Sequence, residues 1–167
     1  DKYVDFNGLG SSSVHTKDKI YLSLGAPEQR SSKIRALAQD NNSKFGKILE
    51  ISKKDLDSII RQEEMELDMK IFTLGHRNPQ GLVWDSKEDV ILSSEHGPIG
   101  GDEVNIIKDG KNYGWPIVSY GSKTDGEETP HDNPNYNFEK PADNFGNYNC
   151  APSEIVKLPA NFLNQKE

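Results

Sequence analysis

The stretch from Thr73 to Pro116 constrains the fold more than any other part of the chain, because short apolar runs alternate there with dense turns. The apolar runs Gly81–Trp84 and Asp89–Ser93 have the length and composition of β-strands. The turns beside them are rich in glycine and polar residues and lie at His76–Gly81, Glu95–Glu103 and Gly110–Pro116. Loops held by short strands often carry binding sites. The stretch therefore predicts a β-rich fold with a site on its turns.

The remaining sequence repeats this strand–turn pattern and predicts an all-β fold. Further strands are expected at Lys19–Leu24, Gly46–Ile51, Lys70–Leu74 and Ile117–Gly121. One short helix is expected at Asp55–Leu67, where Leu56, Ile59, Ile60 and Leu67 follow helical spacing. Polar segments without periodicity, at 1–16, 29–44 and 122–149, are expected to be loops.

Composition excludes several classes of function. The chain has 167 residues and a net charge of -7 without clustered Lys and Arg, so we do not expect it to bind nucleic acid. Its mean hydropathy is -0.79, and no apolar run has the length of a transmembrane helix. The single cysteine, Cys150, cannot form an internal disulfide. The length suggests one domain.

Three motifs in the central stretch carry a family resemblance. They are GHRNPQGL at Gly75–Leu82, EHGPIGGDEVN at Glu95–Asn105 and NYGWP at Asn112–Pro116. In this order and spacing they resemble the soluble glucose/sorbosone dehydrogenases, aldose sugar dehydrogenases that use pyrroloquinoline quinone (PQQ). The resemblance implies a six-bladed β-propeller. Residues 1–167 would then be a fragment of that single domain, containing its middle blades, and the remaining blades would be missing from this chain.

The resemblance also implies cofactor contacts on two turns. Arg77 and Asn78 match a pair that contacts the quinone, and a guanidinium can bind a carboxylate through two hydrogen bonds. His96 and Asp102 match positions near the cofactor. From the residues alone, Arg77 could instead be a buried ion-pair partner that holds its turn, and His96 a hydrogen-bonded loop histidine.

Calcium sites are implied in the same way. Gly97 and Pro98 match positions whose main-chain carbonyls bind calcium beside the cofactor, and calcium prefers oxygen ligands. Glu103 and Tyr113 match positions that hold a second, structural calcium in some relatives, through carboxylate and main-chain oxygen. From the residues alone, Gly97 and Pro98 could form only a tight turn. Tyr113 and Trp115 are expected to pack in the core rather than to stack on the cofactor.

The implied activity is oxidation of an aldose sugar to a lactone, by hydride transfer to the quinone with a histidine as the base, in a periplasmic or secreted protein. Alignment from Lys19 puts that histidine at Phe6 or Asn7, so no catalytic residue is assigned, and His15 falls at a turn. We therefore expect cofactor binding with weak or absent sugar oxidation. Two alternatives remain: a non-catalytic, calcium-stabilised propeller used for binding, and a structural calcium module without cofactor.

Overall fold

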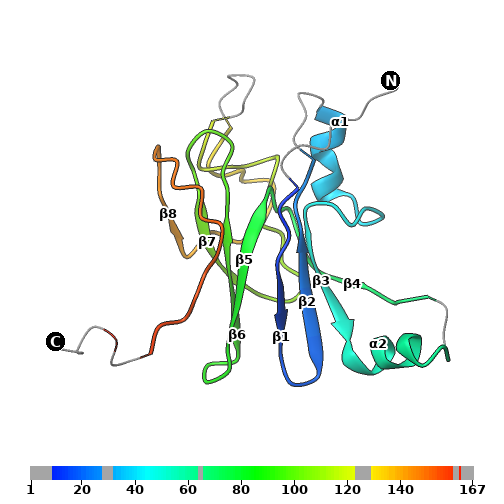
Figure 1. Cartoon of the computed structure of the whole chain (residues 1–167). Coiled ribbons are helices and arrows are strands. Elements are labelled where there is room, and N and C mark those ends of the chain that lie inside the picture. The colour runs from blue at the N-terminus through cyan, green and yellow to red at the C-terminus, as the bar shows by residue number, and fades with distance from the viewer. Residues whose placement is uncertain (1–8, 28–31, 64–65, 123–128, 160–161, 163–167) are drawn as a thin grey trace.

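The computed structural model describes residues 9–27, 32–63, 66–122, 129–159 and 162, and their strands form two four-stranded antiparallel sheets (Figure 1). The first sheet has the order β1 (Ser13–His15), β2 (Lys19–Leu24), β3 (Lys47–Ser52), β4 (Lys70–Leu74). The second has the order β5 (Pro79–Asp85), β6 (Val90–Glu95), β7 (Glu103–Ile107), β8 (Asp143–Asn144). Because strands that follow each other in sequence also pair within each sheet, the expected all-β class is confirmed.

Short helices lie at both ends of the first sheet. The α-helix α1 (Ser32–Arg35) continues into the 3₁₀ helix η1 (Ala36–Gln39) at the upper end in Figure 1, and α2 (Lys53–Ile60) lies at the lower end. The prediction of a loop over 29–44 is therefore wrong for α1 and η1, and the prediction of one helix in all is wrong too. These short helices could not be recognised in the sequence, because they contain too few apolar residues to show a helical period.

The helix α2 begins and ends earlier than the predicted Asp55–Leu67. The residues directly after Ile60, Arg61–Glu63, are polar and offer no apolar face to extend it. Gln62 takes a left-handed φ of 62°, and the Glu63 N–H donates to the Ser58 carbonyl at 3.0 Å. This pattern closes a helix C-terminus.

The strand predicted at Ile117–Gly121 is a turn. Gly114 has a φ of 94°, which favours glycine, and its carbonyl accepts from Ile117 N at 2.7 Å and Val118 N at 3.0 Å. These bonds curl the chain where a strand would need it extended. The strands β1, β7 and β8 are further elements that the sequence did not predict.

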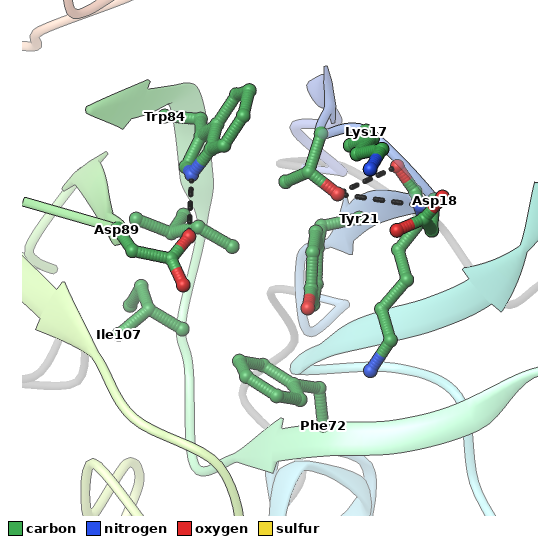
Figure 2. A pocket seen from close by; sticks show the side chains of 10 residues that line it. Lys17, Asp18, Tyr21, Phe72, Trp84, Asp89 and Ile107 are labelled. Atoms are coloured by element: carbon green, nitrogen blue, oxygen red, sulfur yellow. Dashed lines mark hydrogen bonds between the residues drawn. The ribbon is translucent and has the colours of Figure 1, made fainter. Parts of the chain in front are cut away.

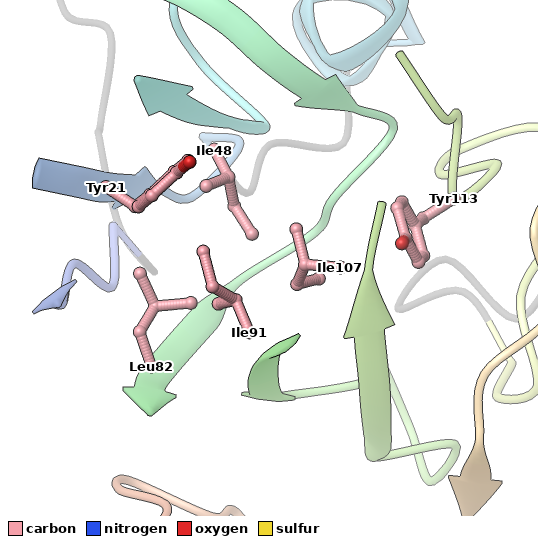
Figure 3. Close-up of a cluster of buried hydrophobic side chains, with 6 residues drawn as sticks. All are labelled: Tyr21, Ile48, Leu82, Ile91, Ile107 and Tyr113. Carbon is pink, nitrogen blue, oxygen red and sulfur yellow. The ribbon is translucent and has the colours of Figure 1, made fainter. Parts of the chain in front are cut away.

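The apolar core lies between the two sheets. Figure 3 shows Tyr21 and Ile48 of the first sheet facing side chains of the second. The buried members of this cluster are Tyr21, Ile48, Leu82, Ile91, Ile107 and Tyr113. Burial of one large apolar side chain contributes about 1.5–3 kcal/mol, so this shared core fixes one sheet against the other.

The loops at the two ends of the strands form two opposite edges of the molecule, which are named separately below. The site edge contains the β4–β5 loop (75–78) and the β6–β7 loop (96–102), at the upper end in Figure 1. The opposite edge contains the β1–β2 turn (16–18) and the β5–β6 turn (86–89). At the site edge, Ala26 N–H donates to Arg77 O at 2.7 Å and His96 N–H to Asn78 O at 3.1 Å. The central motifs therefore meet at one edge.

Candidate functional site

A buried carboxylate, Glu95, holds the β4–β5 loop in place. It is the last residue of β6 and 4 % exposed. Its Oε1 accepts hydrogen bonds from the main-chain N–H groups of Arg77 and of Asn78, the latter at 3.2 Å. Its Oε2 accepts from His76 Nδ1 at 3.0 Å. Because these are bonds to a carboxylate, each is stronger than a neutral one, and together they fix the direction of the Arg77 and Asn78 side chains.

His76 links this carboxylate to the core. Its ring is fully buried and stacks on Tyr113, with ring centroids 4.6 Å apart. Since Nδ1 donates to Glu95, the neutral ring accepts at Nε2 from the Thr73 hydroxyl, 2.8 Å away. Sequence reasoning missed both His76 and Glu95 as site residues. Both lie inside the GHRNPQGL and EHGP motifs, which is the signal that could have found them.

Arg77 presents its guanidinium at the site edge. The side chain is 8 % exposed, and Nη1 donates to the His96 carbonyl at 3.0 Å. The guanidinium carbon lies 5.7 Å from the centroid of the Trp115 ring, which is within cation–π distance. Trp115 also packs with Ala26 and Ala38, in line with its expected packing role. The structure thus brings Arg77, His96 and Trp115 together.

Asn78 and His96 are neighbours of Arg77, and one side-chain atom of each already forms a hydrogen bond within the protein. Asn78 Oδ1 accepts from Gly10 N at 2.6 Å, which leaves its amide NH₂ as the group to offer a ligand. His96 Nε2 lies 3.1 Å from the carbonyl oxygen of Pro152. A carbonyl only accepts, so Nε2 carries the proton and Nδ1 of the neutral ring is an acceptor.

Asp102 lies behind the Gly97–Gly101 turn. It is 2 % exposed, and its Oδ1 accepts from Gly97 N at 2.8 Å. Its Oδ2 accepts from Cys150 N at 2.6 Å and Ala151 N at 2.7 Å. A Cβ built on Gly97 would lie 2.0 Å from the Gly100 carbonyl oxygen. Asp102 therefore shapes the turn and ties it to the chain after β8.

All four residues predicted as calcium ligands border one small space. A cavity of about 10 Å³ is lined by residues that include Gly97, Pro98, Glu103 and Tyr113. A second cavity of about 10 Å³ shares Glu103 and Tyr113. Each volume is close to that of one water molecule or ion. Among the described residues, no cluster of three or more His, Cys, Asp or Glu side chains is placed to hold a metal, so ligation here would need main-chain oxygens in addition to any carboxylate.

The electrostatics of this region are unfavourable for a bare carboxylate. Glu103 accepts from Asn105 Nδ2 at 3.1 Å. Burial, with the nearby negative charges of Glu95 and Asp102, raises the pKa of Glu103 to about 8. A cation bound here would offset this repulsion.

His15 lies far from these residues. It ends β1 at the opposite edge, where it pairs with Ile20, and Ile20 is six residues from Ala26, the residue bonded to Arg77. At ~3.3 Å per residue this separates His15 from Arg77 by about 20 Å, so His15 cannot serve a site at Arg77. Phe6 and Asn7, where the alignment puts the family's base, lie outside the described residues.

Comparison with known proteins agrees with the motifs. A family model described as glucose/sorbosone dehydrogenase matches residues 7–165. The chain belongs to this family. It is 33% identical over 118 residues to aldose sugar dehydrogenase YliI of Escherichia coli (strain K12), covering 68% of this chain and 30% of that protein. It is 41% identical over 90 residues to quinoprotein glucose dehydrogenase B of Acinetobacter calcoaceticus, covering 52% of this chain and 18% of that protein.

A solved structure of a soluble sugar dehydrogenase superposes on most of the chain. The crystal structure of the soluble aldose sugar dehydrogenase from Escherichia coli, in the apo-form, superposes with a TM-score of 0.64 at 30% identity. The match covers 81% of this chain and 39% of that one. The chain therefore spans well under half the length of these relatives. No helix in the described part of the chain is long and apolar enough to cross a membrane.

Proposed function

We propose that this chain forms part of a PQQ- and calcium-dependent aldose dehydrogenase, which oxidises aldose sugars to lactones. The observation that carries the proposal is the convergence of Arg77, Asn78, His96, Gly97 and Pro98 at the site edge. These residues come from two loops, and Glu95 bonds to one of them from beneath. The relatives named aldose sugar dehydrogenase and quinoprotein glucose dehydrogenase support the substrate and cofactor classes.

The donor groups at the site edge fit an anionic, polycarboxylate cofactor. Arg77 offers a guanidinium, whose fork matches a carboxylate. Asn78 offers its amide NH₂, and His96 offers Nδ1 as an acceptor. Asp102 acts through the main chain, because its bonds to Gly97 and the 150–151 segment set the turn. When bound, the quinone would accept the hydride from the sugar C1.

Calcium is proposed at the same turn. Gly97 and Pro98 would supply main-chain carbonyls, and a second ion would use the Glu103 carboxylate and a Tyr113 main-chain oxygen. The two small cavities that share Glu103 and Tyr113 support this arrangement. The raised pKa of Glu103 supports it further, since a divalent cation stabilises the charged carboxylate.

For the fold, we propose that the two sheets are middle blades of a six-bladed propeller, with residues 1–167 belonging to that single domain. The four-stranded antiparallel form of each sheet supports this, as does the partial coverage of the longer relatives. The blades missing from this chain would complete the ring. A periplasmic or secreted location is proposed from the family resemblance.

A second candidate is a non-catalytic, calcium-stabilised propeller used for binding. The position of His15 favours it, because this histidine lies at the opposite edge and cannot replace a base missing near Arg77. His96 borders Arg77 through its carbonyl, whereas His76, which precedes Arg77, is fully buried and bonded to Glu95. Under this alternative, the metal would still bind while sugar oxidation would be absent.

The test is a PQQ titration of the full protein in calcium, followed by a dye-linked aldose assay. Arg77→Ala should weaken PQQ binding at least tenfold, because it removes a charge-assisted pair. The matched control is Arg61→Ala, an exposed arginine at the end of α2, which should bind PQQ as the wild type does. Equal binding by Arg77→Ala would refute the site. PQQ binding without aldose oxidation would favour the non-catalytic alternative.

A further inference from the structure

A groove at the opposite edge is separate from the residues described above. Its volume is about 550 Å³, and it lies between the two sheets where the β1–β2 turn faces the β5–β6 turn. Figure 2 shows Trp84 and Asp89 on one wall, Lys17, Asp18 and Tyr21 on the other, and Phe72 at the base. The volume is in the range of small-molecule sites, about 300–1,000 Å³.

Aromatic rings from both sheets line the groove. Tyr21 and Phe72 pack edge to face, with ring centroids 4.8 Å apart. Trp84 lies across from them, and its indole N–H donates to Asp89 Oδ1 at 3.0 Å. This bond fixes the indole ring while its large apolar surface remains half-exposed. The groove therefore offers a rigid aromatic wall, which orders few side chains on binding.

The rim of the groove is polar, and the charges of the residues that line it are balanced. Lys17 and Lys19 supply two positive charges, and Asp18 and Asp89 supply two negative charges. The Lys19 ammonium is also bonded to Glu50 at 2.7 Å. An anionic or a cationic ligand would meet a like charge on this rim, whereas hydroxyl groups can both donate to carboxylates and accept from ammonium groups. The rim therefore suits a neutral, hydroxyl-rich ligand.

We propose that this groove binds a neutral pyranoside. The apolar C–H face of the sugar ring would pack on Trp84, and its hydroxyl groups would bond to Asp18, Lys17 and Asp89. The proposal does not depend on the function proposed for the site edge, because the groove and Arg77 lie at opposite edges of the sheets and share no residue.

Methyl α-D-glucopyranoside is the probe, because its anomeric oxygen is blocked and the sugar cannot be oxidised at C1. The chain has two tryptophans, so ¹H–¹⁵N spectra of the full chain give two indole signals, which Trp84→Phe assigns. We expect the Trp84 signal to shift with a saturable, millimolar dissociation constant while the Trp115 signal stays still. Glucuronate and glucosamine should bind more weakly, since each meets a like charge.

Two variants test whether the acidic side chains of the groove bind the sugar or only maintain the structure. Asp89→Asn keeps the shape, and Asn tolerates the φ of 52° at this position, so it should fold and bind about tenfold more weakly. Asp18→Asn, on the exposed turn, should also weaken binding. Arg61→Ala, an exposed arginine at the end of α2 that does not line the groove, should leave the titration unchanged. The proposal fails if the Trp84 signal does not move, if both indole signals move without saturation, or if both Asp variants bind as the wild type does.

Discussion

Replacing Glu95 by Gln tests the central argument about the site edge. Gln has nearly the same volume, so the change leaves no cavity, but it removes the charge and turns one of two acceptor oxygens into a donor. The wild-type carboxylate accepts from Arg77 N, Asn78 N and His76 Nδ1. Loss of about two such bonds, at ~1.5 kcal/mol each, predicts a decrease of about 3 kcal/mol in the free energy of unfolding.

The assay is thermal unfolding of the full protein followed by PQQ titration. About 3 kcal/mol corresponds to a decrease of roughly 6–12 °C in Tm for a domain of 150–250 residues, and to a smaller decrease for a longer one. PQQ should also bind more weakly to Glu95→Gln below its Tm, although Glu95 is not proposed to contact the cofactor, because the Arg77 and Asn78 main chain loses its support. Glu88→Gln, exposed on the β5–β6 turn, is the matched control. A Tm change equal to that of the control would refute the assigned role of Glu95.

Two further predictions concern buried charges. The Lys47 ammonium is fully buried and donates to the carbonyls of Leu37, Ala38 and Phe45 at 2.8–2.9 Å, and burial lowers its pKa from 10.5 to about 8. The folded state therefore binds fewer protons than the unfolded state between about pH 8 and 10.5, so the free energy of unfolding should rise with pH in this range. Urea unfolding at several pH values measures this rise. Lys47→Met should remove it, and the control Lys54→Met, at an exposed lysine, should keep it. The pKa of Glu103 is instead raised from 4.5 to about 8, so in chelator the folded state binds more protons and stability should fall as pH rises between these values. Calcium should reduce that loss and raise the Tm. Glu103→Gln should abolish the loss of stability with pH and make the calcium-dependent rise in Tm smaller, because only the second proposed ion uses this carboxylate. Equal Tm values in calcium and chelator for the wild type would contradict the metal site.

The parts of the fold that could be predicted are those with a local signal. The strands Lys19–Leu24 and Lys70–Leu74 were predicted with the bounds they have, because each is a β-rich run that ends next to glycine. The strand β7 was not predicted, because its first residue, Glu103, was assigned to the polar turn that precedes it. The helix α2 was predicted too long because Leu67 matches the helical period without lying on the same helix.

The candidate site likewise has one part that local motifs predict and another part that they do not. Arg77, Asn78, His96 and the Gly97 turn are visible as motifs, and the structure brings them to one edge. The pairing of Glu95 with His76 is different, because the two residues are 19 positions apart. They meet only because the β5–β6 register sets Glu95 opposite Pro79, with an irregularity before Gly81. Register depends on the assembled sheet, so no local pattern could reveal it.

The three bonds of the Asp102 carboxylate also bear on the order in which the molecule assembles. Two of them reach Cys150 and Ala151, which are 48 and 49 residues further along the chain. Closing so long a loop is slow compared with forming the hairpins of each sheet. The Gly97 turn can therefore take its final shape only after the chain beyond β8 has docked. A nascent chain would have both sheets largely formed before the proposed calcium carbonyls were in position, so metal capture would be one of the last events of folding.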